Sequence, residues 1–349
     1  MQEHQTLEQF LADWSKDEES RGDVAATVTA IAEACGAIAE IIALGPLAGA
    51  LAAARGENLD GDVQKELDLR ANDLLTRELQ AAPVACLASE ELDLPSGFDV
   101  TAPLCVAVDP LDGSSNIDTN VSVGTIFSVL PMTCSECRPS RSCFVRKGRA
   151  QLAAGYVIYG PQTALVLTLG SGTHMFTLNP DTGAFCLTRN DCRIPEDTNE
   201  FAINTSNFRR WDGHIRAYVD DCLSGVEGPH GKNYNTRWIA SLVAEAHRIM
   251  VRGGIFLYPG DRRPEYQTGR LRLAYECSPI AFLVEQAGGA ATTGHEDILD
   301  IEPTDVHQRV PLIFGSRNEV RLLEHYYREA HPFQERSQLF GNRGLFRAG

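Results

Sequence analysis

Residues 104–130 read LCVAVDPLDGSSNIDTNVSVGTIFSVL, and the other elements of the chain are placed around them. Two apolar runs, at 104–108 and 125–130, flank the polar turn DPLDGSSN. A short apolar run that ends in turn residues is typical of a buried strand, so the segment predicts a strand, a loop and a second strand. The loop would follow the carboxyl end of the first strand, where α/β folds usually bind their ligands.

The residue types in this turn favour a cation beside a phosphate. Asp109 and Asp112 are separated by two residues, and Pro110 stiffens the backbone between them. Gly113 allows close approach of a ligand, and residues 114–116 add hydrogen-bond donors. Two carboxylates followed by Gly-Ser-Ser amides would hold a hard cation next to an anion. A bare Asp-x-x-Asp-Gly is also common in ordinary surface turns, so only the full string is specific.

The length and charge of the chain limit the classes of function. Its 349 residues suffice for one large domain or two fused ones. A formal net charge of −16 and a pI near 5.0 argue against nucleic-acid binding. Because this charge repels anionic substrates, a phosphate site would need metal ions and a local arginine cluster.

The N-terminal part predicts a soluble, cytoplasmic protein. Residues 1–19 lack the basic and apolar regions of a signal peptide. The longest uncharged stretch, residues 41–54, is too short to cross a bilayer and is interrupted by Gly45-Pro46.

Hydrophobic periodicity predicts a layered α/β fold. Helices are expected at 5–20, 24–44, 63–80, 212–224, 235–250, 270–286 and 317–330. Strands are expected at 84–88, 253–259 and 312–315, with antiparallel hairpins opening at about residue 150. Residues 131–150 are polar and aperiodic, so we expect an exposed connection there.

Six motifs together resemble class I fructose-1,6-bisphosphatase of the bacterial type, a family of the inositol-monophosphatase-like, metal-dependent sugar phosphatases. They are SEE at 89–91, DPLDGSSNID at 109–118, LAAGY at 152–156, GGIFLYP at 253–259, LRLAYECSP at 271–279 and DIEPTDVHQR at 300–309. The resemblance implies an αβαβα sandwich. It further implies a metal- and phosphate-binding domain at 1–200, a substrate-binding α/β domain at 201–335 and a flexible tail at 336–349. Inositol monophosphatase itself is disfavoured, because LAAGY, GGIFLYP and LRLAYECSP belong to the bisphosphatase.

The resemblance also implies roles for individual residues. Divalent-metal ligands would be Glu90, Asp109, the carbonyl of Leu111, Asp112 and Glu276, with Asp62 assisting an additional ion. Asp68 and Glu91 would polarise the attacking water. The substrate would contact Asp112, Gly113, Ser114 and Ser115 at its 1-phosphate and Asn204, Arg237, Trp238, Tyr258 and Arg270 around its sugar and second phosphate.

Two of these positions depart from the family pattern. Arg270 stands where lysine is usual, and a guanidinium favours bidentate phosphate contact. Trp238 stands where the family usually has a phosphate-contacting tyrosine, and an indole cannot act as that hydroxyl. A shifted substrate preference is therefore open.

The implied activity is hydrolysis of D-fructose 1,6-bisphosphate to fructose 6-phosphate and phosphate, with two or more Mg²⁺ ions, or Mn²⁺, in each site. One alternative is a dual enzyme that also accepts sedoheptulose 1,7-bisphosphate. The other is a catalytically silent sugar-phosphate-binding regulatory protein, which the presence of all six carboxylates (68, 90, 91, 109, 112 and 276) disfavours. We expect a homotetramer that shares Arg237 across an interface, and neither nucleic-acid nor membrane partners.

Regulation is less determined by the sequence. AMP-inhibited animal enzymes carry a basic–aromatic pair where this chain has Pro103-Leu104, so AMP inhibition is not expected. Cys134, Cys137 and Cys143 fall in a polar segment where chloroplast enzymes have a redox loop. A thiol switch, a metal-binding knuckle and incidental exposed cysteines all stay open, whereas Cys86 and Cys105 are interpreted as core residues.

Overall fold

The computed structural model describes residues 4–57, 63–132 and 141–328. Asp62, Cys134, Cys137 and the tail expected at 336–349 lie outside the described residues.

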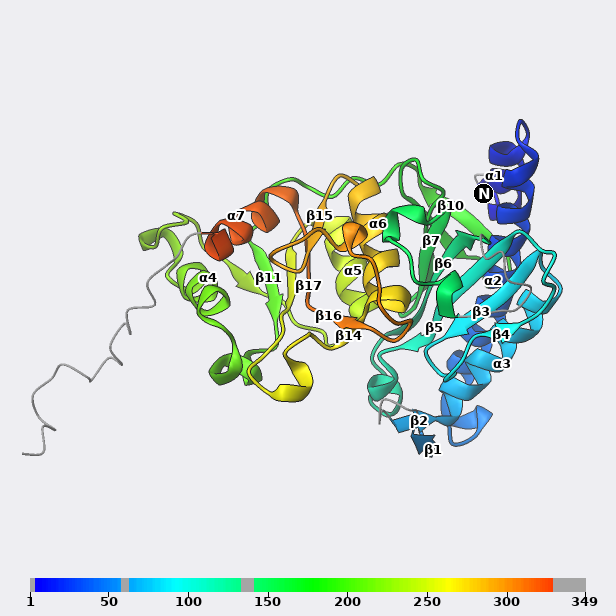
Figure 1. The fold of residues 1–349 in the computed structure, drawn as a ribbon, viewed down its shortest axis with the longest axis horizontal. Helices are drawn as coiled ribbons and strands as arrows, with labels where there is room; N and C mark the ends of the chain where they lie inside the picture. The colour runs from blue at the N-terminus through cyan, green and yellow to red at the C-terminus, as the bar shows by residue number, and fades with distance from the viewer. Residues whose placement is uncertain (1–3, 58–62, 133–140, 329–349) are drawn as a thin grey trace, which may run out of the picture.

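An eight-stranded sheet forms the part of the fold that contains the DPLDGSSN turn (Figure 1). Its strand order is β10-β9-β8-β7-β6-β5-β3-β4, and only β3 and β5 pair in parallel. The strands are β3 (Val84–Ser89), β4 (Ser96–Gly97), β5 (Leu104–Asp112), β6 (Val123–Pro131), β7 (Ala153–Tyr159), β8 (Thr163–Thr168), β9 (His174–Leu178) and β10 (Phe185–Arg189). The predicted strand, loop and strand at 104–130 are confirmed, with β5 continuing to Asp112.

Three N-terminal helices cover the outer face of this sheet, on the right of Figure 1. They are α1 (Leu7–Ser15), α2 (Glu19–Leu44) and α3 (Glu66–Gln80). A capping box starts α1, because the side chains of Thr6 and Gln9 accept hydrogen bonds from each other's backbone amides. Two short antiparallel strands, β1 (Ala54–Glu57) and β2 (Val63–Lys65), connect α2 to α3. The third helix therefore begins at Glu66 rather than at residue 63.

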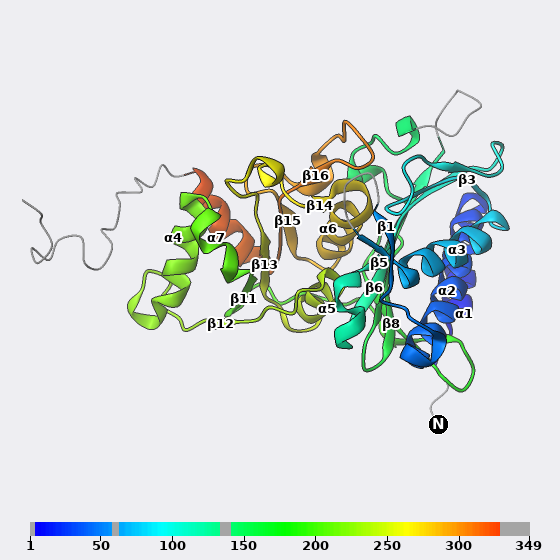
Figure 2. The same cartoon turned by 90° about the horizontal axis from the view of Figure 1, so that it is seen from below.

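Two helices, α5 (Leu242–Arg252) and α6 (Ser278–Gln286), lie between the eight-stranded sheet and a second sheet (Figure 2). One buried cluster joins these layers. It includes Tyr156 from the first sheet, Ile249 and Leu283 from the two helices, and Phe314 from the second sheet. Burial of such side chains supplies the main favourable term for packing the layers.

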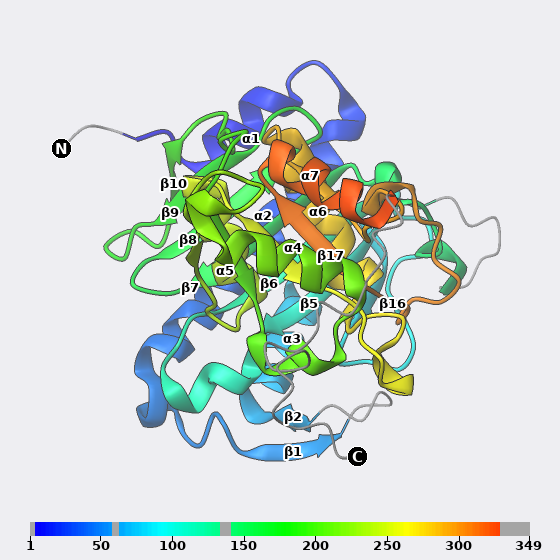
Figure 3. The same ribbon diagram turned by 90° about the vertical axis from the view of Figure 1, so that its left-hand side faces the viewer.

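The second sheet has the order β12-β11-β13-β17-β15. Its strands are β11 (Glu200–Ile203), β12 (Asn235–Thr236), β13 (Ile255–Tyr258), β15 (Ala290–Thr292) and β17 (Leu312–Gly315). Helices α4 (Gly213–Leu223) and α7 (Arg317–Arg328) cover its outer face, and Figure 3 shows them in front of β17. A further small pair is formed by β14 (Leu271–Arg272) and β16 (Arg309–Val310). The layers run α, β, α, β, α, which confirms the predicted sandwich.

Two further helices begin later than predicted. Residues 237–241 are not helical, and α5 starts only after Ser241, whose hydroxyl accepts a hydrogen bond from the amide of Ala244. Ala240 has φ +61°, a left-handed conformation that no α-helix contains. Ile239, predicted in a buried helix face, is 37% exposed. Likewise, the helix expected from residue 270 is preceded by β14 and a π-helical turn, Leu273–Cys277.

The long helix α2 bears on the expectation that no stretch of the chain is long and apolar enough to cross a bilayer. With the following turn it gives a segment, Glu19–Ala48, that is long and apolar enough to cross a bilayer by length and composition alone. In the structure, however, its stripe of Val24, Val28, Ile31 and Ile38 is buried in the core cluster shared with α1, α3 and the sheet. This packing is that of a core helix.

Candidate active site

Three buried carboxylates from different parts of the chain meet at the end of β5. Carboxylate oxygens of Asp109, Asp112 and Glu276 lie within 4.8 Å of one another. They line a pocket of about 100 Å³. The other residues that line it are Val63, Gln64, Asp68, Glu90, Glu91, Leu111, Gly113 and Ser114. The structure thus brings together every predicted metal ligand among the described residues.

The turn after β5 fixes its two aspartates through local hydrogen bonds. The pairing of β5 with β6 is interrupted between Asp109 and Asp112. The amide of Leu111 donates to Oδ1 of Asp109 at 2.9 Å, and the hydroxyl of Thr125 donates to the carbonyl of Pro110 at 2.9 Å. Gly113 then takes φ +76°, which a residue with a side chain adopts only at a cost. The chain can therefore turn sharply beside the carboxylates.

Glu276 lies in the π-helical turn, and a neighbouring arginine orders it. The amide of Arg272 donates to Oε2 of Glu276 at 2.6 Å. Its guanidinium lies 2.5 Å from Oε1 of Glu90. Arg272 was not among the predicted site residues, although its place four residues before Glu276 in LRLAYECSP was an available signal. It supplies positive charge at the edge of an acidic pocket.

Burial and mutual repulsion disfavour the charged forms of the clustered carboxylates. Burial, together with the charge of Glu90, raises the pKa of Glu276 to about 8. Burial raises the pKa of Asp112 to about 6 and that of Asp109 well above its ordinary value. Because a divalent cation would relieve both effects, this set of oxygen donors fits a hard cation such as Mg²⁺. The carbonyl of Leu111 belongs to the same turn.

Asp68 and Glu91 lie beside this cluster with perturbed acidities. Burial raises the pKa of Asp68 to about 6, and burial with the charges of Asp68 and Glu90 raises that of Glu91 to about 7. The amide of Lys65 donates to Oδ2 of Asp68 at 2.6 Å, whereas Oδ1 is buried with no hydrogen-bond partner among the described residues. A buried orphan acceptor of this kind fits a bound water or ion. Carboxylates with pKa near neutrality can take a proton from water.

The Gly113–Ser114 turn is tied to the start of α3 by a lysine that the sequence interpretation did not include. The ammonium of Lys65 donates to the carbonyl of Ser114 at 2.9 Å and lies 3.4 Å from Asp118. Ser114 lines the acidic pocket, while Ser115 is exposed at the start of a short 3₁₀ helix. Lys65 lies three residues before Asp68 in the sequence.

A second hollow contains three of the predicted substrate residues. Asn204, Tyr258 and Arg270 line it together with Asp261, among others. The guanidinium of Arg270 lies 3.7 Å from the ring centroid of Tyr266 and 6.0 Å from that of Tyr258. Its nearest carboxylate oxygen in the described chain belongs to Asp261, at 3.9 Å. Stacking of this kind holds a guanidinium flat and leaves its edge for an anion.

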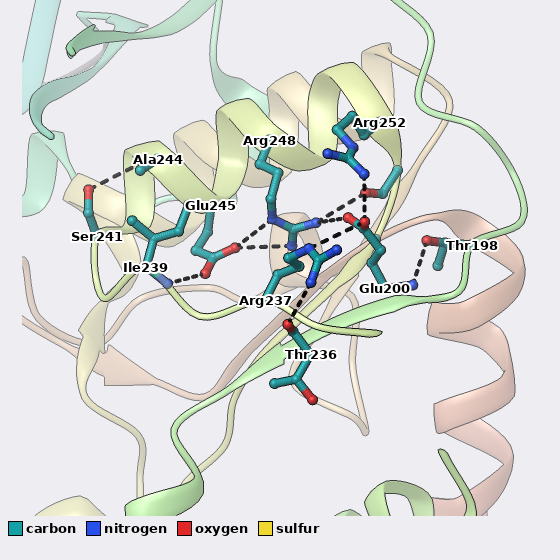
Figure 4. Close-up of polar contacts among 12 residues, drawn as sticks. Thr198, Glu200, Thr236, Arg237, Ile239, Ser241, Ala244, Glu245, Arg248 and Arg252 are labelled. Atoms are coloured by element: carbon teal, nitrogen blue, oxygen red, sulfur yellow. Dashed lines mark hydrogen bonds and ion pairs between the residues drawn. The ribbon is translucent and has the colours of Figure 1, made fainter. Parts of the chain in front are cut away.

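Trp238 and Arg237 lie outside the residues that line this hollow. Trp238 is half-buried and stacks on Phe256 with ring centroids 5.9 Å apart and on Tyr258 at 6.1 Å. Arg237 is largely exposed, and its Nε lies 3.5 Å from Oε1 of Glu200 (Figure 4). The described chain therefore does not bring Arg237 to its own substrate pocket.

Glu200 is the centre of an ion-pair network that Figure 4 displays. Its Oε2 atom lies 2.8 Å from the guanidinium of Arg248, and its Oε1 atom lies 2.8 Å from that of Arg252. The same Oε1 atom also faces Arg237. Arg248 also pairs with Glu245, and Glu245 accepts a hydrogen bond from the amide of Ile239 at 2.7 Å. The network thus fixes the non-helical segment 237–241 that carries both Arg237 and Trp238.

A larger cavity elsewhere is a poorer candidate for phosphate chemistry. It measures about 340 Å³ and lies between α1, α2 and the hairpin of β9 and β10. Its lining includes Glu8, Glu33 and Glu40 and no arginine or lysine. An anionic substrate would be repelled there, so the smaller acidic pocket, which combines carboxylates suited to cations with the turn expected to bind phosphate, is the functional candidate.

Comparisons with known proteins agree with this choice. The N-terminal domain model of "Fructose-1-6-bisphosphatase" matches residues 5–190, and the C-terminal domain model matches residues 194–328. The chain is 54% identical over 347 residues to "Fructose-1,6-bisphosphatase class 1" of Rhizobium meliloti, covering 98% of this chain and 99% of that protein. A relative of the same class from Xanthobacter autotrophicus is 54% identical over 98% of this chain and 92% of that protein. The holo crystal structure of Leishmania major fructose-1,6-bisphosphatase superposes with a TM-score of 0.87 at 35% identity, covering 94% of this chain and all (100%) of that one.

Proposed function

The chain belongs to the fructose-1,6-bisphosphatase family, and from this premise we propose that it hydrolyses D-fructose 1,6-bisphosphate to fructose 6-phosphate and phosphate. The observation that carries the proposal is the meeting of Asp109, Asp112 and Glu276 within 4.8 Å, inside a pocket that ends in the Gly113–Ser114 turn. Cation ligands and phosphate-binding amides are thereby adjacent.

The site residues divide into two groups in this proposal. Glu90, Asp109, Asp112, Glu276 and the carbonyl of Leu111 hold the cations, with Asp62 assisting. Asp68 and Glu91 orient the attacking water and accept its proton, which their raised pKa values support. Phosphoryl transfer needs chiefly positioning and charge neutralisation, so these few side chains suffice for the reaction.

The family implies a divalent-metal requirement, and we propose Mg²⁺, with Mn²⁺ as a substitute, at two or more positions in each site. When bound, such ions neutralise phosphate charge and activate water. The chain's own contribution is to place the oxygen donors before the ion arrives. Arg272 limits their repulsion through its contact with Glu90.

The substrate's orientation follows from the two hollows. The amides of Gly113, Ser114 and Ser115, beside Asp112, receive the 1-phosphate. Asn204, Tyr258 and Arg270 receive the sugar and the second phosphate, because they line one hollow that carries a cationic edge. Trp238 supports Tyr258 by stacking rather than by a hydroxyl contact. We further propose that residues 1–200 and 201–335 act as the two domains, in a cytoplasmic enzyme of carbohydrate metabolism.

The direct test is phosphate release in the presence of Mg²⁺, with fructose 1,6-bisphosphate and sedoheptulose 1,7-bisphosphate compared side by side. We expect release from the fructose substrate and its loss in Asp112→Asn. Comparable release from both sugars would support the dual enzyme, an alternative that Trp238 and Arg270 leave open. No release from either sugar would favour a silent sugar-phosphate-binding protein.

Arg237 motivates a proposal about assembly. We propose a homotetramer in which Arg237 reaches a neighbouring subunit's substrate, because this arginine is exposed and does not line its own pocket. The test mixes Arg237→Ala with Asp112→Asn under conditions that exchange subunits. Hybrids that regain activity support sharing, since one site then has both an intact carboxylate and a donated arginine. Hybrids without activity contradict it.

A further inference from the structure

Three cysteines that are distant in sequence meet in the core. Cys86 lies on β3, Cys105 on β5, and Cys143 ends a 3₁₀ turn, Arg141–Cys143. Their sulfur atoms lie within 4.8 Å of one another, and all three side chains are buried. The expectation that Cys143 is an exposed loop cysteine is therefore wrong. It packs instead with two cysteines that had been interpreted separately as core residues.

Strand pairing sets the geometry of this cluster. Cys86 and Cys105 are direct partners in the parallel ladder of β3 and β5, so both side chains point to the same face of the sheet. Their sulfurs are 3.2 Å apart. A fourth sulfur, the Sδ of Met132, lies 3.3 Å from that of Cys105. Met132 directly follows β6, so the sulfur atoms gather near the end of that strand.

These spacings are those of a metal–sulfur site rather than of scattered core residues. A tetrahedral ion with metal–sulfur bonds of about 2.3 Å places its ligand sulfurs roughly 3.8 Å apart. The Cys86 and Cys105 sulfurs, at 3.2 Å, are somewhat closer than that, and all three sulfurs lie within 4.8 Å of one another. Small side-chain rotations would bring them to that spacing.

The surroundings favour a soft ion. The side chains packed around the sulfurs are mainly apolar, with Ala88, Ala107, Leu130 and Phe144 among them. Thiolate and thioether ligands select Cu(I) and related soft ions, whereas hard cations take oxygen donors. A thioether beside three thiols points to Cu(I) more than to Zn²⁺, whose usual ligands are thiolate, imidazole and carboxylate.

We propose that Cys86, Cys105 and Cys143, with Met132 at their edge, bind one Cu(I) ion. Binding is a ligand exchange without electron transfer: each coordinating thiol gives its proton to solvent as its sulfur bonds to the metal. The copper stays monovalent throughout.

This site is distinct from the acidic pocket but is connected to it through the same two strands. Cys86 lies four residues before Glu90, and Cys105 lies four residues before Asp109. Four residues of a strand span about 13 Å, so the two metal environments do not overlap. Copper would join β3, β5 and the segment around Cys143, and should therefore raise the melting temperature of the whole chain.

The test is a titration of reduced, oxygen-free protein with Cu(I) against the chelator bicinchoninate, in the presence of saturating Mg²⁺. We expect one tightly held Cu(I) per chain and an X-ray absorption spectrum in which sulfur is the only element bonded to copper. Replacement of Cys86, Cys105 or Cys143 by alanine should weaken binding by more than about tenfold. Met132→Leu, which keeps the volume, should give a smaller loss.

Matched variants keep the proposal falsifiable. Cys192→Ala removes a buried thiol elsewhere, and a Cys134→Ser, Cys137→Ser double variant removes the two other thiols of the same polar segment; both should bind copper like the parent. If the double variant lost copper binding and Cys143→Ala kept it, the proposed site would be contradicted. Nitrogen or oxygen ligands in the spectrum, or displacement of Cu(I) by Zn²⁺, would contradict it as well. If Cys86→Ala does not fold, Cys143→Ala and Met132→Leu still decide the question.

Discussion

The Oδ2 atom of Asp112 accepts a hydrogen bond from the backbone amide of Val243 at 3.0 Å, across 131 positions of sequence. Val243 is in the first turn of α5, so a carboxylate of the acidic pocket caps a helix that belongs to the other half of the chain. The positive end of the helix dipole favours the charged carboxylate. This contact fixes the turn at residues 109–113 relative to the segment that carries Arg237 and Trp238.

Asp112→Asn should reduce catalysis while it leaves the stability of the fold nearly unchanged. The amide side chain keeps an acceptor for Val243 but loses the negative charge that a cation needs. We expect kcat/KM to fall by at least about 100-fold, as when a group that stabilises transition-state charge is removed. Phosphate release measures this. Asp112→Ala is the control, because loss of the cap should add roughly 1 kcal/mol of destabilisation in urea unfolding. Equal destabilisation by both variants would contradict the capping role.

Stabilisation by Mg²⁺ should grow with pH. The pKa of Glu276 is raised from 4.5 to about 8 in the folded chain. The contribution of this carboxyl group to the free energy of unfolding of the metal-free chain is therefore largest below pH 4.5. It declines between pH 4.5 and pH 8, because over that range the unfolded state has released a proton that the folded state still holds, and it levels off above pH 8. Mg²⁺ binds the ionised form and removes this penalty.

Differential scanning calorimetry with Mg²⁺ and with a chelator measures that effect. The gap between the two melting temperatures should widen from pH 5 to pH 8, and saturation at 100 times the dissociation constant corresponds to about 2.7 kcal/mol. Glu276→Gln is the matched variant: it should melt higher than the parent in chelator and gain less from Mg²⁺. A gap that is independent of pH would contradict the assignment.

Glu200→Gln should destabilise the chain through its unpaired arginines. The side chain of Glu200 is 8% exposed and pairs with three guanidiniums, so its neutralisation leaves partly buried like charges together. We expect a loss of about 3 kcal/mol in urea unfolding. Arg252→Gln is the control, since that side chain is 61% exposed and should cost less than about 1 kcal/mol. Similar losses in both variants would show that the network is not centred on Glu200.

Arg270→Ala should affect substrate binding more than turnover. The guanidinium stacks on Tyr266, and Arg270 lines the second hollow together with Asn204 and Tyr258. It does not line the acidic pocket. We expect KM for fructose 1,6-bisphosphate to rise by about tenfold or more with kcat nearly unchanged, because a charged hydrogen bond contributes roughly 1.5–3 kcal/mol. Arg270→Lys should recover part of the loss. Arg263→Ala, on the same tyrosine but not among the residues that line the hollow, should leave KM unchanged.

Local signals predicted much of this fold and of its site. The turn at 109–116 and its flanking strands are as expected, because apolar runs and turn residues act over a few neighbours. The helix predicted at 235–250 was wrong in its first part. There Glu245 and Asp112 bind the backbone of residues 239 and 243 and fix a non-helical entry with Ala240 at positive φ. Hydrogen bonds of this kind do not change the hydrophobic periodicity of the sequence, so periodicity could not predict them.

The sequence by itself determined the residue types of the acidic pocket and the αβαβα class, since motif strings and hydrophobic periods are local properties of the chain. Only the tertiary structure decided which distant groups meet. It placed Arg272 on Glu90, Lys65 on the Ser114 turn, and Cys143 beside Cys86 and Cys105. The physical reason is that such contacts depend on how sheets and helices pack, and burial of apolar area fixes that packing without regard to sequence separation.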